Sequence, residues 1–190
     1  MPKVAITQNQ HIETAIAEAL QHLDLDGIID GKIVAVKPND TWASREDLTA
    51  VTQADTLRAV LRFLRTLRPK TLIVSGGAGA AETEEVFRLS GMMQVLEEEG
   101  AEFFDHNRPP FQEVALPYAP EKQVAGPQKA VMVNPRVLEY ETLVSLDRHA
   151  FFGDMHSFIA AMAKRFPAKL ALIVGHPAMI GPGADWGPHL

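Results

Sequence analysis

Short apolar, β-branched runs alternate along this chain with longer stretches in which apolar residues recur every three or four positions. The short runs at residues 32–36 and 71–74 have the composition of buried strands. The stretches at residues 11–23 and 53–67, one before each run, have the period of helices with one face toward a core. Strands that alternate with helices are typical of βαβ units. The sequence therefore predicts an α/β fold with a mainly parallel central sheet and helices on both faces.

The same alternation continues toward the C-terminus. Further strands are expected at residues 101–104, 142–146 and 169–174, and further helices after Glu82, at 92–99 and at 155–166. The segment 107–128 is rich in proline and holds one apolar run, so we expect a surface excursion with an edge strand, or a hairpin with residues 130–133. A chain of 190 residues suits a single α/β domain over residues 1–190.

Composition excludes several classes of function. The chain has no cysteine, so it forms no disulfide or thiolate zinc site and binds no iron–sulfur cluster itself. Its net charge of -6 disfavours binding to nucleic acid or to an anionic membrane surface. No run approaches the roughly 20 apolar residues that cross a bilayer, and the first residues lack a signal-peptide pattern. We therefore expect a cytoplasmic protein with neither nucleic acid nor membrane as a partner.

Polar side chains follow most of the predicted strands, at the point where each strand ends. In open parallel sheets, ligands bind in the crevice beyond the carboxyl ends of the strands, so these side chains are expected to line one pocket. The alternative is that any α/β protein has polar loops at its strand ends. The groups are Lys37, Asn39, Asp40 and Thr41; Ser75, Gly76 and Gly77; Asp105 and His106; Asp147, Arg148 and His149; and His176.

The glycine-rich turn that begins at Ser75 leads toward a helix with an acidic first turn. Glycines let the backbone approach a ligand, and a helix N-terminus attracts anions. The turn lacks both the last small residue of the dinucleotide fingerprint and a Walker lysine, and Glu82, Glu84 and Glu85 would repel a highly charged phosphate. The turn is therefore interpreted either as a cradle for a carboxylate or neutral ligand, or as a plain connection between strand and helix.

Lys37 and Asn39 have two interpretations each. Lys37 either extends to solvent or holds the carboxylate of a substrate, and Asn39 either caps a turn or contacts the same ligand. Asp147 and Arg148 are either a structural ion pair or ligand contacts. His149, in the same loop, is a candidate for proton transfer near neutral pH, as is His156.

Three of the polar residues lie within eight positions of each other and are of metal-ligating types. His149, Asp154 and His156 offer imidazole and carboxylate ligands, and His106 or His176 would complete the set from another strand end. Their spacing matches no defined metal motif, so the alternative is that they are surface or hydrogen-bonding groups.

Several segments resemble one protein family. These are the Val-Ala-Val-Lys-Pro-Asn run that ends at Asn39, the Ser-Gly-Gly turn at Ser75, the helix that ends before Gly91, and the late glycine-rich segments around Gly175 and Gly183. They are similar to the signatures of the family catalogued as domain of unknown function 362. Members of that family are generally longer and are often fused to, or encoded beside, cysteine-rich ferredoxin segments. The resemblance implies an α/β fold, a short or truncated member and a ferredoxin-type partner, and it assigns no reaction.

Together these observations predict that the chain binds a small anionic metabolite at the carboxyl ends of its strands. One alternative is a metal-dependent or acid-base enzyme acting on a hydroxy or keto acid. The other is a noncatalytic scaffold or redox-partner subunit. A homodimer is expected as well, because an uncovered sheet edge or helix face needs burial.

Overall fold

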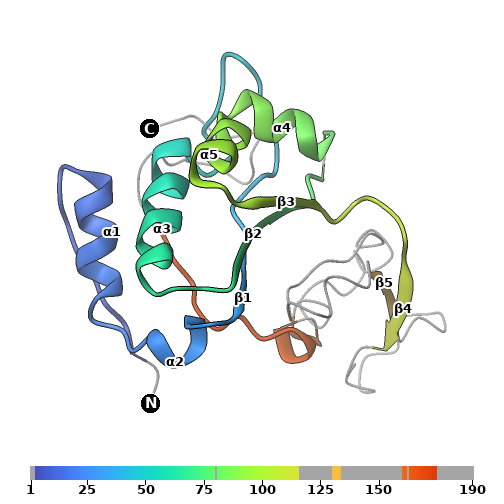
Figure 1. Cartoon of the computed structure of the whole chain (residues 1–190). Helices are drawn as coiled ribbons and strands as arrows, with labels where there is room; N and C mark the ends of the chain where they lie inside the picture. The colour runs from blue at the N-terminus through green and yellow to red at the C-terminus, as the bar shows by residue number, and fades with distance from the viewer. Residues whose placement is uncertain (1–2, 80, 116–129, 134–159, 162, 175–190) are drawn as a thin grey trace. The chain divides into compact units, whose positions relative to one another are not determined.

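A computed structural model describes residues 3–79, 81–115, 130–133, 160–161 and 163–174 of the chain (Figure 1). The chain divides into two compact units. The first unit comprises Met1–Asp105 and Val174–Leu190, and the second unit comprises His106–Ile173. In the described residues, no helix has the length and apolar character needed to cross a bilayer.

A three-stranded parallel sheet forms the centre of the first unit. Its strands β1 (Ile33–Val36), β2 (Thr71–Gly76) and β3 (Glu102–Asp105) lie in the order β1-β2-β3 (Figure 1). Val36 is paired with Val74, and Gly76 with Asp105, so the carboxyl ends of all three strands lie at one edge. The predicted α/β class with a parallel sheet is confirmed.

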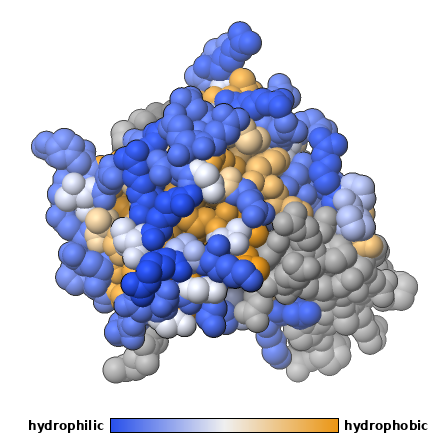
Figure 2. Space-filling model, in the orientation of Figure 1, coloured by the Kyte–Doolittle hydropathy of each residue, from blue (hydrophilic) through white to orange (hydrophobic). Residues whose placement is uncertain are grey.

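Five helices are described around this sheet, and their apolar sides form the core of the unit. Ile16, Leu61, Phe87 and Val95, from four different helices, are buried together with Leu72 and Val74 of the central strand. The helices are α1 (Ile12–Leu20), α2 (Asp26–Ile29), α3 (Ala54–Thr66), α4 (Thr83–Leu89) and α5 (Met92–Glu99). Figure 2 shows that hydrophobic residues reach the surface in patches between hydrophilic side chains. The core therefore lies between the helices and one face of the sheet.

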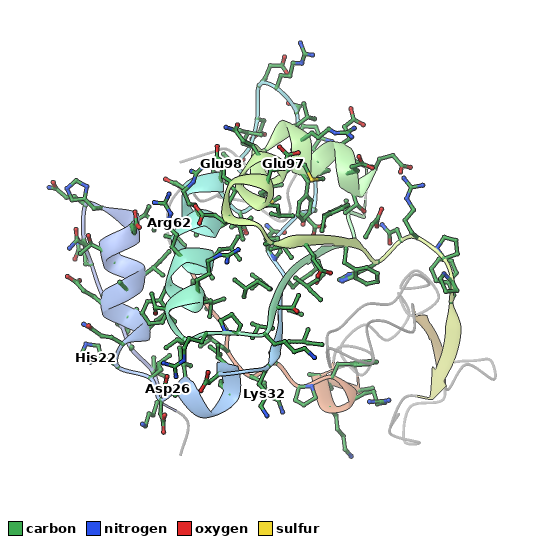
Figure 3. The ribbon with its side chains drawn as sticks, viewed as in Figure 1. His22, Asp26, Lys32, Arg62, Glu97 and Glu98 are labelled. Carbon is green, nitrogen blue, oxygen red and sulfur yellow. The ribbon has the colours of Figure 1, made fainter. Side chains whose placement is uncertain are left out.

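Two arginines of α3 fasten this helix to α5. Arg58 Nη2 lies 2.5 Å from Glu98 Oε2, and Arg62 Nε lies 2.9 Å from Glu99 Oε1. Figure 3 shows Arg62 on α3 near the end of α5 that carries Glu98. Arg58 and Arg62 lie four residues apart on α3, so both are on the face that meets Glu98 and Glu99 of α5.

Backbone conformation fixes the ends of two helices. Gly100 follows α5 with φ 61°, the left-handed region that glycine adopts without steric cost. After α3 the same region is occupied by Arg68, with φ 53°. A residue with a β-carbon pays about 1–2 kcal/mol for this conformation. Arg68 is therefore the strained residue at the start of the turn into β2.

Residues 169–174 are described but form no strand, so the strand predicted there is wrong. The side chain of Ile173 is 93% exposed, and Leu170 and Leu172 are also exposed. An apolar run becomes a buried strand only where a neighbouring strand completes its hydrogen bonds, and this run pairs with none of the described strands. Residues 160–161 and 163–165 are helical, within the helix predicted at 155–166.

The second unit contains a two-stranded antiparallel sheet. Strand β4 (Gln112–Ala115) pairs with β5 (Ala130–Val133), with Val114 opposite Val131. This is the pairing that the hairpin alternative predicted, and it makes a sheet of its own. The predicted strand at 142–146 and residues 116–129 of the proline-rich excursion lie outside the described residues.

Candidate functional site

Two strand ends that the sequence singled out lie next to each other in the first unit. Lys37 follows β1 directly, and Ser75 and Gly76 end β2, the neighbouring strand. Because the two strands are parallel and Val36 is paired with Val74, Lys37 and the turn at Gly77 begin at the same edge of the sheet. This edge is the one at which open parallel sheets bind ligands.

A buried carboxylate, that of Asp40, joins these two strand ends. Its side chain is 4% exposed, and Oδ1 forms an ion pair with Lys37 Nζ. Oδ2 accepts a hydrogen bond of 2.6 Å from the backbone N–H of Gly77. Both carboxylate oxygens thus have charged or polar partners, which a buried carboxylate requires. Asp40 holds the ends of β1 and β2 in a fixed arrangement.

Asn39 fastens the loop that carries Asp40. Its side-chain amide donates to Ala50 O at 3.0 Å, and its backbone N–H donates to Thr52 Oγ1 at 2.8 Å. Thr41 Oγ1 donates to Asn39 Oδ1 at 2.7 Å, and Asp40 forms an isolated antiparallel bridge with Val51. The side chain of Asn39 therefore helps to fix this loop, and Thr41 is bonded to it.

Gly76 is surrounded so closely that only glycine fits there. A β-carbon on this residue would lie 2.5 Å from Phe87 Cε2, 2.6 Å from Asp40 Oδ2 and 2.8 Å from Thr83 Cγ2. A distance below 3.0 Å forces atoms to move. The missing side chain of Gly76 is thus what lets the Asp40 carboxylate reach the Gly77 N–H.

Ser75 presents a buried hydroxyl that lacks a partner. The residue is 1% exposed, and its Oγ has no hydrogen-bond partner in the structure. Burying a hydroxyl without a hydrogen bond costs about 1–3 kcal/mol. Buried polar groups are therefore almost always paired, by protein, water or ligand. Ser75 is the residue of this edge whose surroundings call for a further partner.

Lys37, Asp40, Ser75 and Gly77 form a strand-end cluster, in which Lys37 is more exposed than the other charged residue, Asp40. The side chain of Lys37 is 38% exposed, and Nζ donates to Pro38 O at 2.9 Å as well as contacting Asp40. An ammonium has three N–H donors, so two acceptors leave one donor over. Lys37 is therefore held in place by Asp40 and keeps hydrogen-bonding capacity.

The glycine turn uses its own backbone donors. Gly77 N–H is bonded to Asp40, and Ala78 N–H donates to Thr83 Oγ1 at 3.2 Å. Helix α4 begins at Thr83, and Gly79 lies in the turn before it. The arrangement resembles an anion cradle whose anion is a carboxylate of the same chain.

The remaining predicted site residues are not tested by this geometry. Asp105 is the last residue of β3 and is 9% exposed. His106 is the first residue of the second unit. The described residues contain no group of three histidine, aspartate or glutamate side chains able to hold a metal ion. Asp147, Arg148, His149, Asp154, His156 and His176 lie outside the described residues, so the proton-transfer and metal roles proposed for them stay predictions.

Asp40 is the residue whose importance the sequence concealed. Its position after a strand was visible, but its burial was not, because aspartate in a loop after proline is ordinarily a solvent-exposed turn residue. Two features of the sequence together could have indicated the buried carboxylate. One is a lysine at a strand end three residues before an aspartate, and the other is a pair of glycines at the end of the next strand.

The fold and this strand-end cluster define an α/β protein with an open parallel sheet whose loops gather at the carboxyl edge of the strands. The family model described as Domain of unknown function (DUF362) matches residues 34–148, which is more than half of the chain. The chain belongs to this family. No curated protein and no solved structure matches the chain.

Proposed function

We propose that the chain binds a small organic acid at the carboxyl edge of β1 and β2, with the Ser75 hydroxyl and the Lys37 ammonium donating to its oxygen atoms. The observation that carries this proposal is the buried Ser75 Oγ without a partner. A ligand oxygen placed there would supply the missing hydrogen bond and offset the cost of burying the hydroxyl.

Asp40 narrows the chemistry of the ligand. Because Asp40 neutralises Lys37, the edge has little net positive charge to offer, and a phosphate dianion would be repelled by the buried carboxylate. A hydroxy or keto acid with a single carboxylate instead carries one negative charge, and its oxygen acceptors suit one hydroxyl donor and one remaining ammonium N–H. A carboxylate ligand is therefore favoured over a phosphate at this edge.

The experiment measures binding of glycolate, lactate and pyruvate to the full chain by titration calorimetry, for the native protein and for Ser75→Ala. We expect at least one acid to bind and Ser75→Ala to weaken it by about tenfold or more, the value of a hydrogen bond to a charged group. Lys37→Met should weaken the same acid. Absence of saturable binding for all three acids would refute the proposal, as would unchanged affinity in Ser75→Ala.

Ser90→Ala is the matched control. Ser90 is also buried, but its Oγ donates to Val86 O at 2.8 Å inside α4 and its C-cap. Removing that hydroxyl should change the stability of the protein slightly and the affinity for the acid not at all. A loss of affinity in Ser90→Ala equal to that in Ser75→Ala would mean that the effect comes from general destabilisation.

A homodimer and a ferredoxin-type partner are proposals of the same kind. β1 and β3 are the outer strands of the described parallel sheet, and outer strands leave backbone groups for pairing with another chain. Native mass spectrometry of the purified chain would show a dimer directly, and a monomer at micromolar concentration would contradict the first of these proposals.

A further inference from the structure

A cleft of about 330 Å³ lies at the opposite edge of the sheet from the proposed acid site. It is formed where β2 and β3 begin, and its charged lining residues are Arg65, Arg68, Lys70 and Glu102. Three cations against one carboxylate stand out in a chain whose net charge is -6. All of the lining residues belong to the first unit.

Arg65 differs from the other arginines of its helix. Arg58 and Arg62 pair with Glu98 and Glu99, whereas Arg65, which lies about one turn further along α3, forms no ion pair or side-chain hydrogen bond within the described part of the chain. The reason is local. Helix α5 ends at Glu99. The next residue, Gly100, lies beside Arg65, since a β-carbon built on it would be 3.1 Å from Arg65 Nη2, but it has no side chain that could form a pair.

Lys70 adds a second cation that lacks a counter-ion. Its backbone N–H donates to Lys32 O at 2.8 Å, which ties the residue before β2 to the residue before β1. Figure 3 shows Lys32 at this amino end of β1. The side chain of Lys70 has no ion pair among the residues that the structure describes, so its charge is available to an external anion.

Arg68 provides the third cation, on a strained backbone. Its φ of 53° is unusual for a residue with a side chain, and its carbonyl accepts a hydrogen bond of 3.0 Å from Gly31 N–H. Its guanidinium forms an ion pair with Asp30, in which Nη2 lies 3.2 Å from Oδ2. Strained residues persist where the surrounding structure fixes them, and they cluster at functional sites. Glycine would fit this position better, yet an arginine lines the cleft.

A structural explanation accounts for only part of this arrangement. Cations near the carboxyl end of a helix interact favourably with its dipole, which is equivalent to about half a negative charge. With Asp30 and Glu102 both counted, the three cations still outnumber the carboxylates near the cleft, and neither Arg65 nor Lys70 has an ion pair within the described residues. Two such cations match a dianion with several acceptor oxygens, and a planar guanidinium binds two of those oxygens at once.

We propose that the cleft formed by Arg65, Arg68 and Lys70 binds a phosphate dianion, either inorganic phosphate or the phosphate group of a small metabolite. This site is independent of the proposed acid site, because it uses the amino ends of the strands and none of the same residues. The basic edge selects phosphate, whereas the edge at Asp40 disfavours it.

The test titrates the full chain with inorganic phosphate and with glycerol 3-phosphate in 150 mM salt, and it follows backbone amides by NMR. We expect saturable shifts at Arg65, Lys70 and Gly100, and at least a tenfold loss of affinity in the double variant Arg65→Ala, Lys70→Ala. Tighter binding of the ester than of inorganic phosphate would identify a metabolite, and equal binding would identify the free ion. Either result supports the site.

Two variants keep the result interpretable. Arg88→Ala removes an exposed arginine that pairs with Glu84 within α4, so it lowers the positive charge by one unit, half the change in the double variant, and should leave phosphate affinity unchanged. Ser75→Ala should leave it unchanged too, which separates this site from the acid site. Non-saturable shifts in the native chain, or an equal loss of affinity in Arg88→Ala and in the double variant, would overturn the proposal.

Discussion

A β-carbon on Gly76 would meet a carboxylate oxygen of Asp40 at 2.6 Å, so the identity of residue 76 and the position of residue 40 depend on each other. Phe87 closes the same space from α4, with its ring 4.9 Å from that of Phe103 on β3. The space beside Gly76 at the end of the central strand is thus filled by the Asp40 carboxylate, the Phe87 ring and the methyl group of Thr83.

Replacing Gly76 with alanine should lower the free energy of unfolding by about 2–3 kcal/mol, the upper range for overpacking in a filled interior. The reason is that all three neighbouring atoms must move. Urea unfolding followed by circular dichroism measures the change. Gly27→Ala is the control, because nothing lies within 4 Å of a β-carbon there. Equal stability of the two variants would contradict the packing described.

Asp40→Ala should destabilise the protein by about 1–3 kcal/mol, because it leaves the Gly77 N–H and part of the Lys37 ammonium without an acceptor. Asp40→Asn keeps an oxygen for the Gly77 N–H and should lose less. Chemical denaturation of both variants gives the comparison. An alanine variant as stable as the native chain would show that Asp40 does not hold the two strand ends together.

The Asp30–Arg68 pair has a pH signature. The hydrogen bond from Arg68, reinforced by its positive charge, lowers the pKa of Asp30 below the ordinary aspartate value. A carboxyl with a lowered folded-state pKa contributes stability above its unfolded-state pKa, and this contribution is lost as the pH falls through the lowered value. NMR titration should find the pKa of Asp30 below that of an ordinary aspartate in the native chain and back near the ordinary value in Arg68→Ala.

The left-handed backbone at Arg68 predicts an unusual order of stability. Arg68→Gly and Arg68→Ala both remove the guanidinium, but only glycine adopts φ 53° without strain. The glycine variant should therefore be more stable than the alanine variant by about 1 kcal/mol. Thermal unfolding of the pair tests this order. A glycine variant no more stable than the alanine variant would mean that the backbone relaxes when the arginine is lost.

Local patterns in the sequence were sufficient for the longer helices of the first unit, but the four-residue helix α2 was not predicted. The helix predicted at residues 92–99 has these bounds in the structure, and α3 lies within its predicted range. The strand predicted at 71–74 continues through Ser75 and Gly76, because both residues pair with β3. Strand length thus depends on a neighbour that is distant in sequence, and the same dependence explains why the run at 169–174 forms no strand.

The site was less predictable than the fold for the same physical reason. Lys37, Ser75 and Gly77 were recognised by their positions after strands. Asp40 becomes a buried partner only because residues 50–52 return alongside Asn39, a contact that no local pattern encodes. The orphaned hydroxyl of Ser75 likewise becomes apparent only when its surroundings are known.

The length of β2 sets a geometric condition on any ligand of this protein. Six residues, Thr71–Gly76, separate Lys70 from Gly77. At about 3.3 Å of rise per residue the strand measures roughly 17 Å from its first to its last residue, more than the span of a lactate or a glycerol phosphate. Neither of these molecules bridges both edges, so simultaneous occupancy takes two molecules, and the central strand is one of the elements that connect them.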